Sequence, residues 1–179
     1  MRRRAVLSTL ATGTTAGCIG GILGLSSDDS RFTIENDSVP DGLPATLSAT
    51  LVSGATAEHP PMLRVTFECT AESKQAIRFG YPSPFSDVVS ADTDGSRLVL
   101  QYKPDSNDRR NGCWQSGHLG GRGTTERQTL EPGEKSQVEW AVLSYAKNES
   151  CFPSGRYRFE DQYSVGGETY SWGFWFRVR

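Results

Sequence analysis

Apolar and polar residues alternate along several segments of this chain, which is typical of strands with one buried and one exposed face. The segment 170–178 is the clearest, because its even-numbered positions are all aromatic or aliphatic. Similar alternation runs through 63–69, 136–145 and, less regularly, 155–165. The pattern predicts strands in these four segments, and weaker strands at 32–35, 46–53, 76–81, 97–102 and 127–130.

Runs of proline and glycine separate the predicted strands and supply turns. Examples are Pro60-Pro61, Pro132-Gly133 and Gly166-Gly167. About seven to nine short strands at this spacing favour an all-β sandwich. The chain has 179 residues, of which 36% are hydrophobic and 10% aromatic, and this suits a single domain with a substantial core. We place that domain at 41–179.

The N-terminal segment has the features of an export signal. Three arginines, Arg2 to Arg4, precede a weakly apolar stretch that ends in Ala16-Gly17-Cys18. The arginines resemble the twin-arginine pattern, and the end of the stretch resembles a lipobox. The resemblance implies that residues 1–17 are a signal peptide, that Cys18 is lipidated, and that 18–40 tethers the domain to the outer face of the cell membrane.

An uncleaved helical anchor is the alternative for this segment. No charged residue lies between Ala5 and Ser27, a length that is sufficient to cross a hydrocarbon core as a helix. Five glycines make the stretch only marginally apolar. Both interpretations place the domain outside the membrane.

The charge of the chain differs between its ends. The formal net charge is −2, from 19 basic and 21 acidic residues, and removing Arg2 to Arg4 leaves 16 basic residues and a net charge of −5. Such an acidic domain is not expected to bind nucleic acid, which requires a basic face. Only four of the basic residues are lysines, a composition that resembles the proteins of salt-loving archaea.

The later strands resemble those of immunoglobulin-like domains. A Pro132-Gly133 turn leads into one predicted strand. The segment from Pro153 through Gly155 to Tyr157 forms the start of the next predicted strand. In that family the tyrosine hydroxyl caps the backbone at a corner, a role that the resemblance implies for Tyr157. Taken whole, the chain resembles archaeal surface lipoproteins with an immunoglobulin-like domain, a class that shares a fold without sharing one function.

Three cysteines remain if Cys18 carries lipid, so at most one disulfide can form within the domain. Cys113 and Cys151 both lie in loop-like sequence and are the favoured pair. Cys69 lies on the apolar face of its predicted strand and is expected to be a small buried hydrophobe. A bridge from Cys69 to either of the others is the alternative.

Residues suited to catalysis are sparse. His59 and His118 are the only histidines, neither lies in a triad motif, and the chain has no Gly-x-Ser-x-Gly sequence. We therefore expect neither enzymatic activity nor a cofactor. The oxygen-rich segment 105–108 could contact calcium, but it lacks the rest of a calcium loop and is expected to be a polar turn.

A copper site is the alternative function. Cys113 and His118 have the Cys-x4-His spacing that resembles some blue-copper proteins, and His59 and Met62 could complete the ligand set. Against this, no methionine follows His118, and Cys113 has a possible disulfide partner.

The segment 103–125 is the favoured recognition surface, because long loops on a rigid sandwich commonly carry binding residues. Its alternative is a mobile edge loop with no such role. Tryptophan and arginine dominate binding energy at many interfaces. We therefore expect a non-enzymatic binding module for a surface protein or a glycan. The candidate binding residues are Arg109, Arg110, Trp114 and Arg122 in this segment, with Trp175 on the exposed face of the last strand. Sequons at Asn36 and Asn148 agree with an external location.

Overall fold

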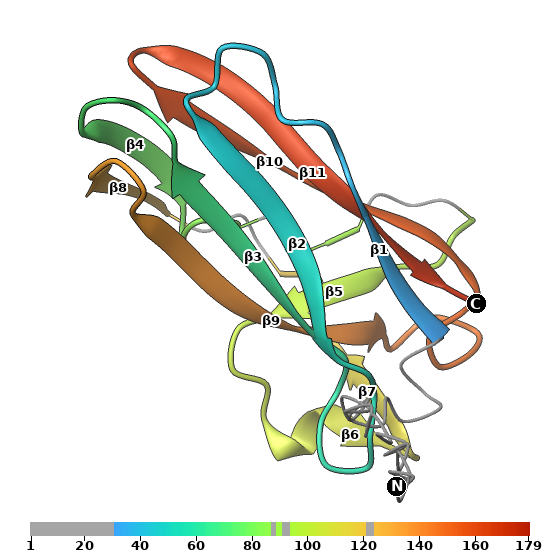
Figure 1. Cartoon of the computed structure of the whole chain (residues 1–179). Helices are drawn as coiled ribbons and strands as arrows, with labels where there is room; N and C mark the ends of the chain where they lie inside the picture. Colours follow the sequence, from blue (N-terminus) through green and yellow to red (C-terminus); the bar gives the residue numbers. More distant parts are fainter. Residues whose placement is uncertain (1–30, 87–88, 91–93, 121–123) are drawn as a thin grey trace, which may run out of the picture.

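The computed structural model describes residues 31–86, 89–90, 94–120 and 124–179. The predicted signal peptide, Cys18 and Arg122 therefore lie outside the described residues. The described chain forms two β-sheets and a short 3-10 helix (Figure 1). The elements are β1 (Phe32–Asn36), β2 (Ala45–Ser53), β3 (Met62–Cys69), β4 (Gln75–Gly80), β5 (Leu98–Gln101), η2 (Ser106–Asp108), β6 (Arg109–Arg110), β7 (Cys113–Ser116), β8 (Thr125–Leu130), β9 (Lys135–Tyr145), β10 (Gly155–Val165) and β11 (Glu168–Val178).

The first sheet has five antiparallel strands in the order β1-β11-β10-β4-β8. Strands β10 and β11 form a long hairpin whose pairing runs from Gly155 opposite Val178 to Val165 opposite Glu168. The hairpin turn is Gly166-Gly167, and both residues have positive φ, which glycine adopts without steric cost. Strand β10 meets β4 over only two residue pairs, close to this turn.

The second sheet has six strands, with β2-β3-β9-β7-β6 in order and β5 also paired with β9. Strand β9 is its centre, because it pairs with β3, β5 and β7. The β7 pairing is parallel, with Gln115 opposite Ser144 and Ser116 opposite Tyr145. In the described part of the chain, no helix is long and apolar enough to cross a bilayer.

Alternating side chains of the two sheets form the core between them. On β11, Trp172, Phe174 and Phe176 are at most 1% exposed, as the period-two pattern predicts. Phe85, from the segment after β4, inserts between the sheets with its ring centroid 5.4 Å from that of Phe174. The all-β, two-sheet class expected from the sequence is therefore confirmed.

The structure differs from the sequence-based expectation at two places. Eleven strands are described rather than seven to nine, because β6 and β7 form inside the segment 103–125 that was expected to be an insertion without strands. The packed domain also begins before residue 41. Phe32 and Ile34 lie opposite Val178 and Phe176, so the predicted strand at 32–35 is part of the first sheet rather than of a tether.

Two buried tyrosines differ in whether their hydroxyl groups form a hydrogen bond. The Tyr157 hydroxyl donates to the carbonyl oxygen of Pro153 at 2.7 Å, which confirms the predicted corner contact. The Tyr163 hydroxyl is buried and finds no hydrogen-bond partner among the described residues. Burial raises the pKa of both phenols, and that of Tyr163 rises well above its usual value.

These two tyrosines give a matched pair of substitutions. We expect Tyr157→Phe to lower the free energy of unfolding by about 1 to 2 kcal/mol, because the partly buried Pro153 carbonyl loses its donor. Tyr163→Phe is expected to leave stability unchanged or to raise it by about 1 kcal/mol, because it removes an unsatisfied buried hydroxyl. Chemical denaturation of both variants measures the difference, and equal losses in the two variants would contradict the assignment.

The same burial gives a pH dependence. The folded state keeps the Tyr163 phenol protonated, whereas in the unfolded chain it ionises near pH 10. Stability is therefore expected to fall as the pH rises above about 10, and the fall should be smaller in Tyr163→Phe.

Candidate functional site

A disulfide between Cys113 and Cys151 joins β7 to the segment between β9 and β10, and this confirms the favoured pairing. The two cysteines are 38 positions apart in sequence. Cys69 is a free thiol and is buried, as expected from its place on the inner face of β3. The disulfide therefore joins the segment 103–125 to the connection between β9 and β10 at one defined point.

Removing this bridge tests how much the segment depends on it. We expect Cys113→Ser together with Cys151→Ser to lower the free energy of unfolding by about 3 to 4 kcal/mol, through the larger entropy of the unfolded chain. Thermal and denaturant unfolding measure the loss. Cys69→Ala serves as a control that leaves the disulfide intact. A double variant as stable as the native protein would contradict a stabilising role for the disulfide.

The candidate binding residues are not brought together. Arg109 and Arg110 are exposed on β6, whereas Trp114 on β7 is only 6% exposed. The Trp114 indole nitrogen donates to the carbonyl oxygen of Thr56 at 3.0 Å, so this ring packs in the core and offers little surface to a partner. Trp175 lies on β11 of the other sheet.

Trp175 is on the outer face of its sheet, as predicted, and is flanked by arginines. The guanidinium carbons of Arg156 and Arg158 lie 4.6 and 5.4 Å from the centroid of its ring. Arg158 also forms ion pairs with Asp37 and Glu160, and its hydrogen bond to Glu160 lowers the pKa of that carboxyl group. The ring is therefore part of a surface network of cation–π contacts and ion pairs.

A cleft of about 500 Å³ lies where the segment 103–125 passes the end of β4 and the edge strand β5. Two of its aromatic residues are exposed, Tyr81 at 54% and Tyr102 at 45%. Its lining residues are Tyr81, Pro82, Ser86, Val99, Leu100, Gln101, Tyr102, Asp108, Arg110, Gln115, Ser116, Gly117, His118, Gly120 and Trp140.

Trp140 forms the buried side of this cleft. Its ring is 1% exposed and contacts that of Tyr102 edge to face, with centroids 6.1 Å apart. The Trp140 indole nitrogen has no hydrogen-bond partner among the described residues, although buried donors are normally paired. The amine nitrogen of Lys103 lies 5.1 Å from the Tyr102 ring centroid.

Hydrogen bonds hold the polar side of the cleft. The Gln101 side-chain amide donates to Asp108 at 2.6 Å, and the same carboxylate oxygen accepts from the backbone nitrogen of Asp105 at 2.8 Å. Asp105 in turn caps η2, and its hydrogen bond from the Asn107 backbone lowers the pKa of its carboxyl group. The segment 105–108 is thus a capped turn, as expected.

The Cys113 and His118 copper hypothesis gains no support from these contacts. The sulfur of Cys113 is bonded to Cys151 and is not a thiolate. The ring of His59 faces the carbonyl oxygen of Pro60 at 2.9 Å. Among the described residues, no three side chains of histidine, cysteine, aspartate or glutamate are grouped closely enough to hold a metal ion.

Sequence reasoning did not select Tyr81, Tyr102 or Trp140 as site residues. Tyr81 and Tyr102 each lie just beyond the end of a strand, beside a turn that contains proline. Connecting segments lie on the surface and often carry binding residues. An aromatic residue just outside a predicted strand was therefore the signal that could have identified these two tyrosines. Their convergence with Trp140 depends on pairing between strands that are distant in sequence.

The two sequon asparagines are engaged with backbone groups. The Asn148 side chain accepts from the Arg97 nitrogen at 2.9 Å and donates to the Arg97 carbonyl oxygen at 2.8 Å. The Asn36 side chain makes the same pair of contacts with Ala49 of β2, which links the two sheets. Both amides therefore have structural roles that a glycan would disrupt.

The Asn148 contacts predict a specific loss. We expect Asn148→Asp to lower the free energy of unfolding by about 2 kcal/mol, because the carbonyl oxygen of Arg97 would face a carboxylate in place of a donor. Glu149→Gln, a change at the neighbouring exposed position, is the control. Denaturant unfolding measures both, and a native protein whose mass shows a glycan at Asn148 would contradict the structural role.

The described residues thus form a two-sheet all-β domain with a cleft beside strand β5. Comparison of this chain with protein-family models, with curated proteins and with solved structures finds no match.

Proposed function

We propose that this chain is a membrane-tethered, extracytoplasmic binding protein without enzymatic activity, and that it holds a neutral glycan in the Tyr81–Tyr102 cleft. The single observation that carries the proposal is the cleft that two exposed tyrosine rings share with Trp140, whose buried indole nitrogen has no hydrogen-bond partner among the described residues. The domain is immunoglobulin-like in this proposal, which the two-sheet arrangement and the Tyr157 corner support.

The lining of the cleft suits a sugar. A sugar ring has apolar C–H faces and a polar hydroxyl edge, and a tyrosine offers an apolar ring with a hydroxyl at its tip. Gln101 and Gln115 add amides, which both donate and accept hydrogen bonds. Asp108 and Arg110 carry opposite charges, so the cleft has no strong preference for a charged ligand.

The sequence of the N-terminus supports the cellular location. Cys18 is the proposed lipid site, and β1 begins 14 positions later at Phe32. A fully extended chain of that length spans at most about 50 Å, so the domain would remain close to the membrane surface. Stable attachment by lipid requires two chains or a diether.

The test uses the full-length protein in a neutral detergent and an array of neutral oligosaccharides, followed by calorimetry with any glycan that binds. We expect Tyr102→Ala and Tyr81→Ala each to weaken binding by roughly 10-fold or more, as loss of an aromatic contact does at other interfaces. Val52→Ala, at a residue that is 46% exposed on β2, is the matched control and should bind normally.

Two results would contradict this function. If no glycan binds but a surface protein crosslinks to the native chain beside Tyr102, the ligand is a protein. If glycan binding survives Tyr102→Ala and is lost in Trp175→Ala, the site is on the outer face of the first sheet.

A further inference from the structure

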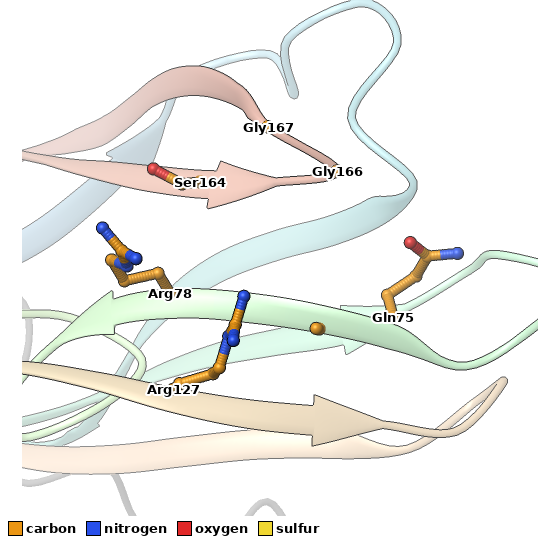
Figure 2. A pocket seen from close by; sticks show the side chains of 7 residues that line it. Gln75, Arg78, Arg127, Ser164, Gly166 and Gly167 are labelled. Carbon is orange, nitrogen blue, oxygen red and sulfur yellow. The ribbon is translucent and has the colours of Figure 1, made fainter.

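A second hollow lies on the first sheet, between the β10–β11 turn and strands β4 and β8. Its volume is about 460 Å³. Figure 2 shows Arg78 from β4 and Arg127 from β8 extending on the same side of the sheet, toward the strand that carries Ser164. The turn residues Gly166 and Gly167 border the hollow without side chains that could fill it.

The strand register places the two arginines side by side. Arg78 is directly opposite Arg127 in the β4–β8 pair and directly opposite Ser164 in the β10–β4 pair. Residues that face each other across antiparallel strands have their Cβ atoms about 5 Å apart. Like charges in this position repel and destabilise a sheet, so the pair is unfavourable unless something negative lies between the two groups.

Neither arginine has a carboxylate partner within the described residues, whereas Arg156, Arg158 and Arg177 on the same sheet do. The two acidic residues that line an adjoining hollow together with Arg78 have other partners. Asp161, beside Arg78 in an adjoining hollow, accepts two hydrogen bonds from Ser86. Glu160 pairs with Arg158. Two unneutralised guanidinium groups thus lie together in a domain whose net charge is negative.

We propose that Arg78 and Arg127 form a binding site for an oxyanion group, with Ser164 and Gln75 as additional donors. A guanidinium group presents paired N–H donors that match the oxygens of a sulfate, phosphate or carboxylate group. Ser164 contributes a hydroxyl and Gln75 an amide at the border of the same hollow. The shared chemistry of these ligands is a compact anion with several acceptor oxygens, either free or carried by an acidic surface polymer.

The site lies far from the point at which the chain enters the domain. Ser164 is nine positions along β10 from Gly155, the residue paired with the C-terminal end of β11, where β1 also begins. At about 3.3 Å per residue this places the hollow roughly 30 Å from the point at which the chain enters the domain. If the chain is anchored at Cys18 as proposed, the site is at the end remote from the membrane (Figure 1). The binding chemistry itself does not depend on the cleft or on the anchor.

The test compares dextran sulfate, uncharged dextran and inorganic sulfate as probes of the full-length protein, by calorimetry in moderate and in high salt. We expect dextran sulfate to bind and uncharged dextran not to bind. Arg78→Gln and Arg127→Gln should each weaken dextran sulfate binding by roughly 10-fold or more. Arg78→Lys and Arg127→Lys, which keep the positive charge, should retain part of the affinity. Arg179→Gln removes an exposed arginine just after β11, at the opposite end of the first sheet, and should change the affinity less than twofold.

The sulfate arm distinguishes the two sources of ligand. Binding of inorganic sulfate that is lost in Arg78→Gln identifies a site for a free oxyanion, and binding of dextran sulfate alone identifies an acidic polymer. Dextran sulfate binding that is unchanged in the double variant Arg78→Gln with Arg127→Gln would overturn the proposal.

Stability provides an independent readout. If the arginines await an anion, Arg78→Gln relieves repulsion, so the unliganded variant should melt at the same or a higher temperature and lose the rise that dextran sulfate gives the native protein. A variant that melts lower and still shows that rise would indicate a purely structural role. If the native protein binds dextran sulfate but no neutral glycan, the proposed function is overturned and this site stands.

Discussion

The aromatic inner face of the β10–β11 hairpin is the constraint on which the rest of the molecule depends. The rings of Phe159 and Phe174 stack across the hairpin with centroids 5.4 Å apart, and Tyr163 contacts Phe67 and Phe79 from the strands around it. Burial of rings of this size provides much of the favourable free energy of folding. Because successive side chains of a strand point to opposite faces, the same packing fixes which residues of β10 and β11 face solvent.

That fixed alternation determines the character of the outer face. Arg158 and Trp175 are opposite each other in the register, so the guanidinium group lies over the indole ring. Gly173 makes this possible, because a Cβ at that position would be 2.1 Å from the Phe159 carbonyl oxygen and 3.0 Å from the Arg158 guanidinium. Much of the outer face of β1, β11 and β10 is thus a neutralised network, and the two guanidinium groups over its ring leave Trp175 only partly exposed on that face.

Sequence reasoning recovered the features whose signals are local. Period-two alternation located the long strands, and the Pro153 to Tyr157 motif located the corner whose hydroxyl contact the structure contains. It placed the disulfide because Cys69 lies on an apolar strand face while the other two cysteines do not. Strand β7 was missed, since its four residues bury only Trp114 and Ser116 and lie in a polar segment. Trp114 consequently looked like a surface contact, although parallel pairing with β9 draws its strand against the core.

The features that escaped prediction all depend on register between distant strands. Nothing near Arg78 in the sequence indicates that Arg127, 49 positions later, is its neighbour. Tyr81 and Trp140 likewise meet at one cleft only after β4, β5 and β9 have found their places. The contrast with Arg158 is informative, because Arg156, Arg158 and Arg177 on the same sheet each form an ion pair with a carboxylate. Within the described residues, the first sheet pairs its other outer-face arginines with carboxylates and leaves one facing pair without such a partner. This concentrates positive charge at a single place, and selection for stability alone gives no reason to keep such a pair.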